Sequence, residues 1–219
     1  MKDYSFVSNA VIRRLPRYRR TLKDLIQKGV HVVSSTELGD LISYTASQIR
    51  QDLSNFGTFG LQGYGYDVKG LYHQINTILG LNNKYKMVIV GTGNLGQAIA
   101  NYTHFYKSGF DTVALFDVNP KIIGLRINDI EVLDFHRIDE FLGHNEIDIG
   151  IITTSRRSAQ SVADKLVKGG VRGIWNFAAA DLAVPDDIAI ENVHLSDSLH
   201  ILAYQINQKS ITVKRRKSS

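Results

Sequence analysis

The chain has 219 residues, 43% of them hydrophobic and 21% charged, which is enough for one large or two small globular cores. It contains no cysteine, no apolar run of membrane-spanning length and no signal-peptide core, so we exclude disulfides and zinc–thiolate sites and expect a cytoplasmic protein with no membrane partner. The net charge of +5 is uneven: residues 1–80 hold ten Lys and Arg against six Asp and Glu, whereas residues 81–213 hold twelve against fifteen. This distribution favours a polyanionic partner for the N-terminal part alone.

The chain opens with a helical pattern that Gly29 ends. Apolar residues recur there at steps of three and four, at Val11, Ile12, Leu15, Tyr18, Leu22, Leu25 and Ile26. Six cations share the same segment, and each of them can either contact phosphate or face solvent: Arg13, Arg14, Arg17, Arg19, Arg20 and Lys23.

Two short helices with a tight turn between them follow, which is the pattern of a helix-turn-helix. Ser34 and Glu37 have the spacing of a capping box, and the helix that they start reaches about Ile42. Thr45 and Gln48 repeat this spacing at the start of the helix TASQIRQDLSNF.

Glycines alternate with aromatic residues over residues 56–68, which predicts a β-hairpin with Gly63 near its tip. A hairpin directly after a helix-turn-helix makes a winged helix. Helical spacing returns over Val68–Leu81, and Asn82-Asn83-Lys84 marks the expected domain boundary.

Residues 87–117 carry the most informative pattern: an apolar strand, a GxGxxG turn, an amphipathic helix, and a second apolar strand ending in an acid. Gly91 permits the sharp turn, Gly93 lets a pyrophosphate approach the backbone, and Gly96 lets helix and strand pack closely. The free N–H groups at the helix N-terminus then face the phosphates. This βαβ unit predicts a dinucleotide site.

Asp117 lies 21 residues after Gly96, where a carboxylate can bind ribose hydroxyls and would repel a 2′-phosphate. We therefore expect NAD(H) rather than NADP(H). Two alternatives stay open: a glycine-rich turn that binds nothing, and an Asp117 that only caps the turn at Asn119-Pro120. The expected cofactor contacts are Gly91, Thr92, Gly93, Asn94, Leu95, Gly96 and Asp117.

The alternation continues with strands at 147–153 and 171–177 and a helix at 158–168, which predicts a parallel sheet. Ser196–Gln208 has helical spacing with a broad apolar face, and the basic tail 214–217 is expected to be disordered. The predicted fold is α/β: an N-terminal winged helix, a Rossmann-type sheet and a C-terminal helix. The predicted parts are 1–82 (DNA binding), 83–193 (NAD(H) binding), 194–209 (C-terminal helix) and 210–219 (tail).

The second helix of the helix-turn-helix has the composition of a recognition helix. Arg and Gln read base edges in the major groove, while Ser bonds to phosphate. For Gln48 and Arg50 an ordinary solvated face is the alternative. The residues expected to contact DNA are Ser47, Gln48, Arg50, Gln51 and Ser54, with Gln62 and Tyr64 in the hairpin.

Taken in order, the segments VSSTELGDLISYTASQIRQDLSNFGTFGLQGYGYDVKGL, VIVGTGNLGQAIANY and ALFDVNPKIIG resemble the Rex family of redox-sensing transcriptional repressors, and the likeness runs from about Ile12 to Gln205. The resemblance implies a homodimer in which residues 194–209 form the dimerisation helix, swapped between subunits. It also implies that double-stranded operator DNA is bound with NAD⁺ or with an empty site and released when NADH binds. Family DNA contacts fall on Ala46, Ser47, Gln48, Arg50, Gln51, Ser54, Gln62, Gly63 and Tyr64.

The resemblance further implies an interdomain switch that involves Arg20 and Tyr102, the latter also near the cofactor. Three departures affect these expectations. Gln51 and Gln62 stand where the family has Lys and a basic residue, which removes up to two phosphate contacts and roughly one unit of salt slope for each. His194 replaces the switch carboxylate, with an acid only at Asp197, and Asn176-Phe177-Ala178-Ala179 lacks the family's proline.

Two other functions compete with a NADH-responsive repressor. An NAD-dependent oxidoreductase with an N-terminal accessory domain would need a substrate domain, but only about thirty residues follow the nucleotide domain, and the seven histidines show no metal-binding spacing such as HExxH. We therefore expect neither an enzyme nor a metal. A constitutive DNA-binding regulator with an empty cleft is the third possibility.

Overall fold

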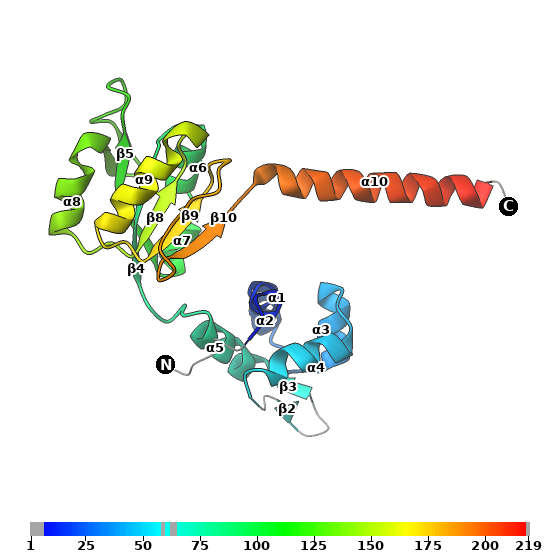
Figure 1. Cartoon of the computed structure of the whole chain (residues 1–219). Coiled ribbons are helices and arrows are strands. Elements are labelled where there is room, and N and C mark those ends of the chain that lie inside the picture. Colours follow the sequence, from blue (N-terminus) through cyan, green and yellow to red (C-terminus); the bar gives the residue numbers. More distant parts are fainter. Residues whose placement is uncertain (1–6, 58–59, 62–64, 218–219) are drawn as a thin grey trace. The chain divides into compact units, whose positions relative to one another are not determined.

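The computed structural model describes residues 7–57, 60–61 and 65–217 (Figure 1). The chain divides into two compact units, Met1–Asn83 and Lys84–Ser219. Each unit has its own buried core, so each is described by itself.

The predicted opening helix is in fact two helices, α1 (Asn9–Ile12) and α2 (Leu15–Gln27). Pro16 causes the break, because it lacks the N–H that would bond to the carbonyl of Ile12 and its ring clashes with that carbonyl. Gly29 follows α2 with φ +74°, as expected of a glycine after a helix.

The helix-turn-helix consists of α3 (Ser35–Ile42) and α4 (Ala46–Ser54). Both hydrogen bonds of the predicted capping box at Ser34 are present. Only one bond of the second predicted box is present. The Thr45 hydroxyl accepts from the backbone N–H of Gln48 at 3.1 Å, but the Gln48 side chain donates to Asp52 and does not bond back to Thr45. The helices pack through fully buried residues, among them Tyr18, Leu22, Leu38 and Ile49.

A three-stranded antiparallel sheet completes this unit, in the order β1–β3–β2. The hairpin strands are β2 (Gly60–Leu61) and β3 (Gly65–Asp67), and α5 (Val68–Ile78) follows directly. The first strand, β1 (Val32–Val33), was not predicted. These elements form the expected winged helix.

The second unit is built on a seven-stranded sheet in the order β10–β9–β8–β4–β5–β7–β6. Every pairing is parallel except β6 with β7. Without β6, this is the order of a doubly wound dinucleotide-binding sheet. The strands are β4 (Tyr85–Val90), β5 (Phe110–Asp117), β6 (Arg126–Ile127), β7 (Ile130–Asp134), β8 (Ile149–Ile152), β9 (Gly173–Asn176) and β10 (Ala189–Asn192).

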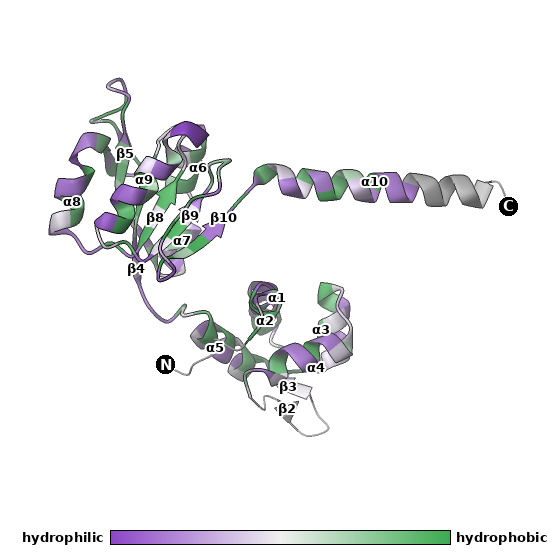
Figure 2. Cartoon of the chain, in the orientation of Figure 1, coloured by the Kyte–Doolittle hydropathy of each residue, from purple (hydrophilic) through white to green (hydrophobic). Residues whose placement is uncertain are grey.

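Helices cover both faces of this sheet, as its apolar strands require (Figure 2). One face packs on α8 (Ile138–His144) and α9 (Arg156–Lys168), through a core that includes Leu142, Val162 and Leu166. The other packs on α6 (Asn94–Ala100) and α7 (His104–Lys107). A 3₁₀ turn, η1 (Phe135–Arg137), joins β7 to α8.

The last helix, α10 (Leu195–Lys217), is longer than predicted. It runs through most of the segment expected to be a disordered tail, and that expectation is wrong as far as Lys217. No Gly or Pro interrupts the segment after Leu195, so no helix-breaking residue ends the helix earlier.

Candidate nucleotide cleft and DNA-facing helix

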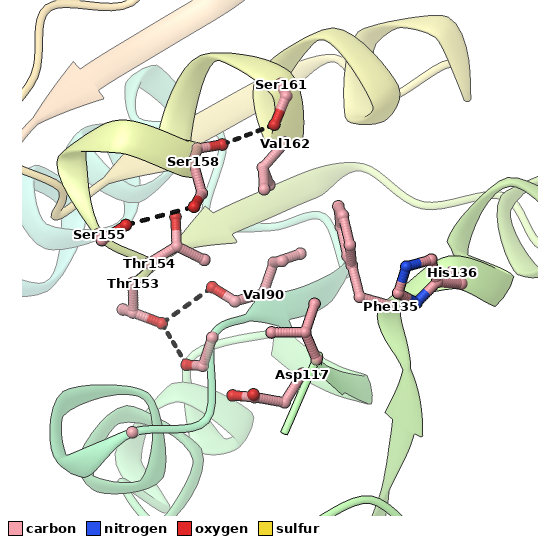
Figure 3. A pocket seen from close by; sticks show the side chains of 13 residues that line it. Val90, Asp117, Phe135, His136, Thr153, Thr154, Ser155, Ser158, Ser161 and Val162 are labelled. Atoms are coloured by element: carbon pink, nitrogen blue, oxygen red, sulfur yellow. Dashed lines mark hydrogen bonds between the residues drawn. The ribbon is translucent and has the colours of Figure 1, made fainter. Parts of the chain in front are cut away.

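A cleft of about 440 Å³ opens where parallel strands end in the second unit (Figure 3). Doubly wound sheets bind ligands at this edge, and the volume falls in the range of small-molecule sites. Its lining comes from the ends of β4, β5 and β8, from η1 and from the start of α9: Val90, Gly91, Gly93, Asp117, Val118, Phe135, His136, Thr153, Thr154, Ser155, Ser158, Ser161 and Val162.

The three glycines of the GxGxxG turn differ in what requires them. Gly91 has φ +97°, and a Cβ there would lie 2.8 Å from the Thr153 backbone. A Cβ on Gly96 would lie 2.0 Å from the Gly91 carbonyl oxygen. At Gly93 a Cβ would meet no atom within 4 Å, so the protein itself does not need a glycine there. The open space beside Gly93 fits a dinucleotide whose pyrophosphate approaches the backbone closely.

Asp117 is held by the turn that it faces. One of its oxygens accepts from the backbone N–H of Thr92 at 2.6 Å and from the Thr92 hydroxyl at 3.0 Å, and the other accepts from the Asn119 amide at 2.9 Å. Burial acts to raise the pKa of Asp117, but these bonds outweigh it and leave the pKa below its ordinary value. The residue is therefore a fixed anion at the end of β5. The bond from the backbone N–H of Asn119 supports the alternative that Asp117 caps the turn at Asn119-Pro120, although Asp117 also lines the cleft.

Hydroxyl groups line the opposite side of the cleft, at the end of β8 and the start of α9 (Figure 3). The Thr153 hydroxyl lies 2.6 Å from the Gly91 carbonyl and ties the two strand ends together. The buried Thr154 Oγ1 has no hydrogen-bond partner within the described ranges. An orphaned hydroxyl in the wall adds to the fit, because a polar ligand can satisfy it.

Not every predicted cofactor residue lies on the cleft. Thr92 is fully buried and acts through Asp117, while Asn94 and Leu95 begin α6 outside the lining. Tyr102 is 53% exposed and lines a separate hollow, with its ring 4.7 Å from that of Phe105. Its cofactor contact stays a prediction.

Most of the lining was not predicted: of the thirteen lining residues, only Gly91, Gly93 and Asp117 are among the expected cofactor contacts. Val118, Phe135 and His136 follow β5 and β7, and the hydroxyl residues follow β8. One signal was present: residues after the carboxyl ends of parallel strands meet at one edge. Strand β7 was not predicted, so Phe135 and His136 had no expected position.

The exposed face of α4 is the one that was predicted, with Ser47, Arg50, Gln51 and Ser54 all exposed. Ala46 and Gln48 are half-buried at its edge. Arg50 donates to the Ser35 hydroxyl at 2.9 Å, which braces it against α3. The expected hairpin contacts Gln62, Gly63 and Tyr64 lie outside the described residues.

The cations of α1 and α2 separate into different roles. Arg14 forms an ion pair with Asp52 of α4, and Arg19 donates to Asn76 of α5. Arg17 lies over the Tyr44 ring at 5.2 Å. These three arginines have partners within the first unit, so their presence does not require a contact with DNA. Arg20 is exposed.

The proposed switch residues lie in both units. Arg20 and Tyr102 are exposed, His194 is half-buried and Asp197 is exposed near the start of α10. The Asp197 amide donates to the His194 carbonyl at 3.1 Å, a bond of the helix start rather than of a switch. The joint role of these residues stays a prediction.

Among residues 7–57, 60–61 and 65–217, no group of His, Asp and Glu side chains is arranged to hold a metal ion. Within the same residues, no helix is both long enough and apolar enough to cross a membrane.

Two family models match the chain: a putative DNA-binding protein N-terminus over residues 6–54 and a CoA binding domain over residues 82–180. A redox-sensing transcriptional repressor Rex from Caldanaerobacter subterraneus subsp. tengcongensis is 52% identical over 98% of this chain and 96% of its own. One from Clostridium botulinum strain Hall is 57% identical over 92% and 96%.

Solved structures agree with these relatives. The Rex-family repressor RSP has a TM-score of 0.89 at 51% identity and covers 96% of this chain and 98% of its own. RSP has also been solved with β-NADH, and with β-NAD⁺ and operator DNA, both with a TM-score of 0.88. The fold and the site thus define a winged-helix protein with a Rossmann domain. These relatives are named as repressors and not as enzymes, which removes the oxidoreductase alternative. The chain belongs to the Rex family of redox-sensing transcriptional repressors.

Proposed function

We propose that this protein is a homodimeric repressor that binds double-stranded operator DNA and releases it when NADH occupies the cleft. One observation carries the proposal: a single chain joins a helix with an exposed polar face to a cleft with open space beside Gly93. The related repressor RSP has been solved with β-NADH and with operator DNA, which supports the same pairing of ligands. We further propose that the protein works in the cytoplasm, where bacterial DNA and NADH are found together.

The cleft favours NAD(H) over NADP(H) on electrostatic grounds. Asp117 is an anion at the end of β5, and its lowered pKa keeps it charged at neutral pH. A second anion on the ribose would be repelled there, whereas ribose hydroxyls can donate to its oxygens. Gly91, Gly93 and the N-terminus of α6 are the residues that would hold the pyrophosphate.

The DNA would contact α4 and the hairpin. The proposed contacts are Ala46, Ser47, Gln48, Arg50, Gln51 and Ser54 on the helix, and Gln62, Gly63 and Tyr64 on the hairpin. Because Gln51 and Gln62 carry no charge, we expect a weaker salt dependence than a family member with two cations there, by roughly one unit of slope for each.

The apolar side of α10 supports a dimer. Large apolar residues along it are about half to two-thirds exposed, and green and purple segments alternate along the helix in Figure 2. A row of this kind marks a protein interface, and we propose that a second copy covers it, with the helices swapped between subunits. The residues are Leu195, Leu199, Ile201, Leu202, Tyr204 and Ile206.

NADH can shift the protein away from operator binding only if it binds the two conformations with different affinity. We propose that Arg20, Tyr102, His194 and Asp197 distinguish these conformations. If NADH changes the spacing between the two recognition helices of a dimer, both operator half-sites cannot be bound together.

Operator binding across a series of NADH:NAD⁺ ratios tests the proposal, with a duplex selected from random DNA by the protein itself. We expect NADH to weaken operator binding by about 5- to 150-fold and the operator to weaken NADH binding by the same factor. Titration of NADH fluorescence with and without the duplex gives the second value. Operator affinity that is independent of the ratio would instead indicate a constitutive regulator.

A further inference from the structure

A buried carboxylate joins the recognition helix to α2. Asp52 lies in α4, is fully buried and accepts four hydrogen bonds. Oδ2 accepts from Arg14 Nε and from the Tyr18 hydroxyl, both at 2.6 Å. Oδ1 accepts from an Arg14 terminal nitrogen and from Gln48 Nε2, both at 2.7 Å. These four donors fill the acceptor sites of an ionised carboxylate.

The charge of Asp52 fixes which end of the Gln48 amide faces it. Burial acts to raise the pKa of Asp52, but the bonds from Arg14, Tyr18 and Gln48 outweigh it and hold the pKa below its ordinary value. An ionised carboxylate can only accept hydrogen bonds. Gln48 must therefore turn its NH₂ group toward Asp52.

The remaining polar atoms of Gln48 then form a defined pattern. Among the residues that the structure describes, no group bonds to Oε1 or to the second hydrogen of Nε2, so both are left for another partner. Gln48 lies in the first turn of α4, beside exposed Ser47 and Gln51, and recognition helices contact base edges with their N-terminal residues. One acceptor beside one donor matches the N6 amino group and N7 of adenine, whereas O6 and N7 of guanine require two donors.

We infer that Asp52 is a positioning residue that holds Gln48 in the orientation that reads adenine in the operator. The inference rests on the proposed DNA binding and adds to it a base preference and the residue that imposes it. Asp52 itself touches no base, because it is fully buried.

The test measures binding to duplexes in which each base pair of the half-site is varied in turn. We expect the wild-type protein to prefer adenine over guanine at one position by about 5- to 150-fold, the discrimination typical of a bidentate contact. Gln48→Met should remove this preference and leave the others unchanged. Gln74→Met is the matched control, because Gln74 is an exposed glutamine in α5 with no proposed DNA contact, and it should leave the preference intact.

Two further variants distinguish a positioning role of Asp52 from a purely structural one. Gln48→Glu keeps the bonds from Arg14 and Tyr18 to Asp52 but removes the amide donor and sets a second carboxylate against Asp52. It should lose the adenine preference, because a carboxylate cannot donate to N7. Asp52→Asn offers one donor and one acceptor, so it permits both orientations of the Gln48 amide. We expect it to narrow the adenine preference several-fold, without a matching loss at other positions.

A purely structural Asp52 would instead weaken binding to all duplexes alike. That result, or an unchanged profile for Gln48→Met and Gln48→Glu, would overturn the inference while DNA binding stands. If Asp52→Asn does not fold, the two Gln48 variants still decide the matter. Failure of the wild-type protein to bind any duplex would overturn the proposed function, and this inference with it.

Discussion

The two candidate sites are built from different materials. At the recognition helix, side chains hold the site together: Asp52 accepts hydrogen bonds from the side chains of Arg14, Tyr18 and Gln48. In the cleft, the backbone forms most of the site, because the glycine turns shape the space and two backbone N–H groups donate to Asp117. The first site should therefore be sensitive to loss of charge, and the second to addition of atoms.

The largest effect is expected from Arg14→Met, because it leaves the fully buried Asp52 without its cation. Removing one partner of a buried ion pair costs about 3–5 kcal/mol of unfolding free energy. Urea denaturation measures the loss, with hydrogen exchange to assign it to the first unit. Arg17→Met is the matched control: Arg17 is exposed and lies over Tyr44, so we expect a loss of about 1 kcal/mol or less. Equal losses in both variants would contradict the importance of the pair.

In the cleft, an added methyl group should have effects that depend on its position. Gly96→Ala places a Cβ 2.0 Å from the Gly91 carbonyl, and overpacking of this kind costs about 1–3 kcal/mol or more. Gly93→Ala should leave the stability nearly unchanged, because its Cβ meets no protein atom. It should nevertheless weaken NADH binding at least tenfold, since the methyl group fills space beside the pyrophosphate. Isothermal titration measures this affinity, and normal NADH binding by Gly93→Ala would exclude the predicted position of the dinucleotide.

The same contrast explains what the sequence could predict. The capping box at Ser34 and the GxGxxG turn are local patterns, and their expected geometry is confirmed at Ser34, Gly91 and Gly96. The Asp52 cluster was missed, because Arg14 lies 38 residues away and no local spacing links the two. Winged-helix and Rossmann architectures follow from local patterns, whereas the bonds that orient Gln48 depend on tertiary packing.

Missed strands have a similar cause. Val32 and Val33 form a strand of two residues, too short to show a period, and their pairing with β3 is long-range. Ala189–Asn192 lies at the sheet edge with only Ile190 half-buried, so it lacks the continuous apolar run of a central strand. Phe135 and His136 of the cleft lining follow β7 and could not be placed without that strand.

The N-caps of α4 and α9 also differ between the two sites, and we expect smaller changes in stability from them. The Thr45 hydroxyl caps α4 by accepting a hydrogen bond from the backbone N–H of Gln48, whereas Ser155 at the start of α9 makes no capping bond. We expect Thr45→Ala to cost about 1 kcal/mol and Ser155→Ala only a few tenths. Hydrogen exchange in the first turn of each helix gives both values. A larger loss at Ser155 would mean that its hydroxyl supports the cleft in another way.

Acid is expected to have the smallest effect, because the stability that the Asp52 charge contributes falls only as the pH drops through the ordinary carboxylate pKa of 3.8 and below it. The folded-state pKa of Asp52 lies below its ordinary value of 3.8, so the stability that its ionised form contributes is present above that value and is lost as the pH falls through the folded-state pKa. Asp52→Asn lacks this contribution. Its difference in stability from the wild type should therefore stay constant from neutral pH to about pH 5 and shrink below about pH 4. Thermal unfolding across this range measures the difference, and Asp117→Asn provides the parallel in the cleft, where the carboxylate pKa is also lowered. A difference that stays constant into strong acid would show that the charge of Asp52 contributes nothing and that its shape alone holds α4 on α2.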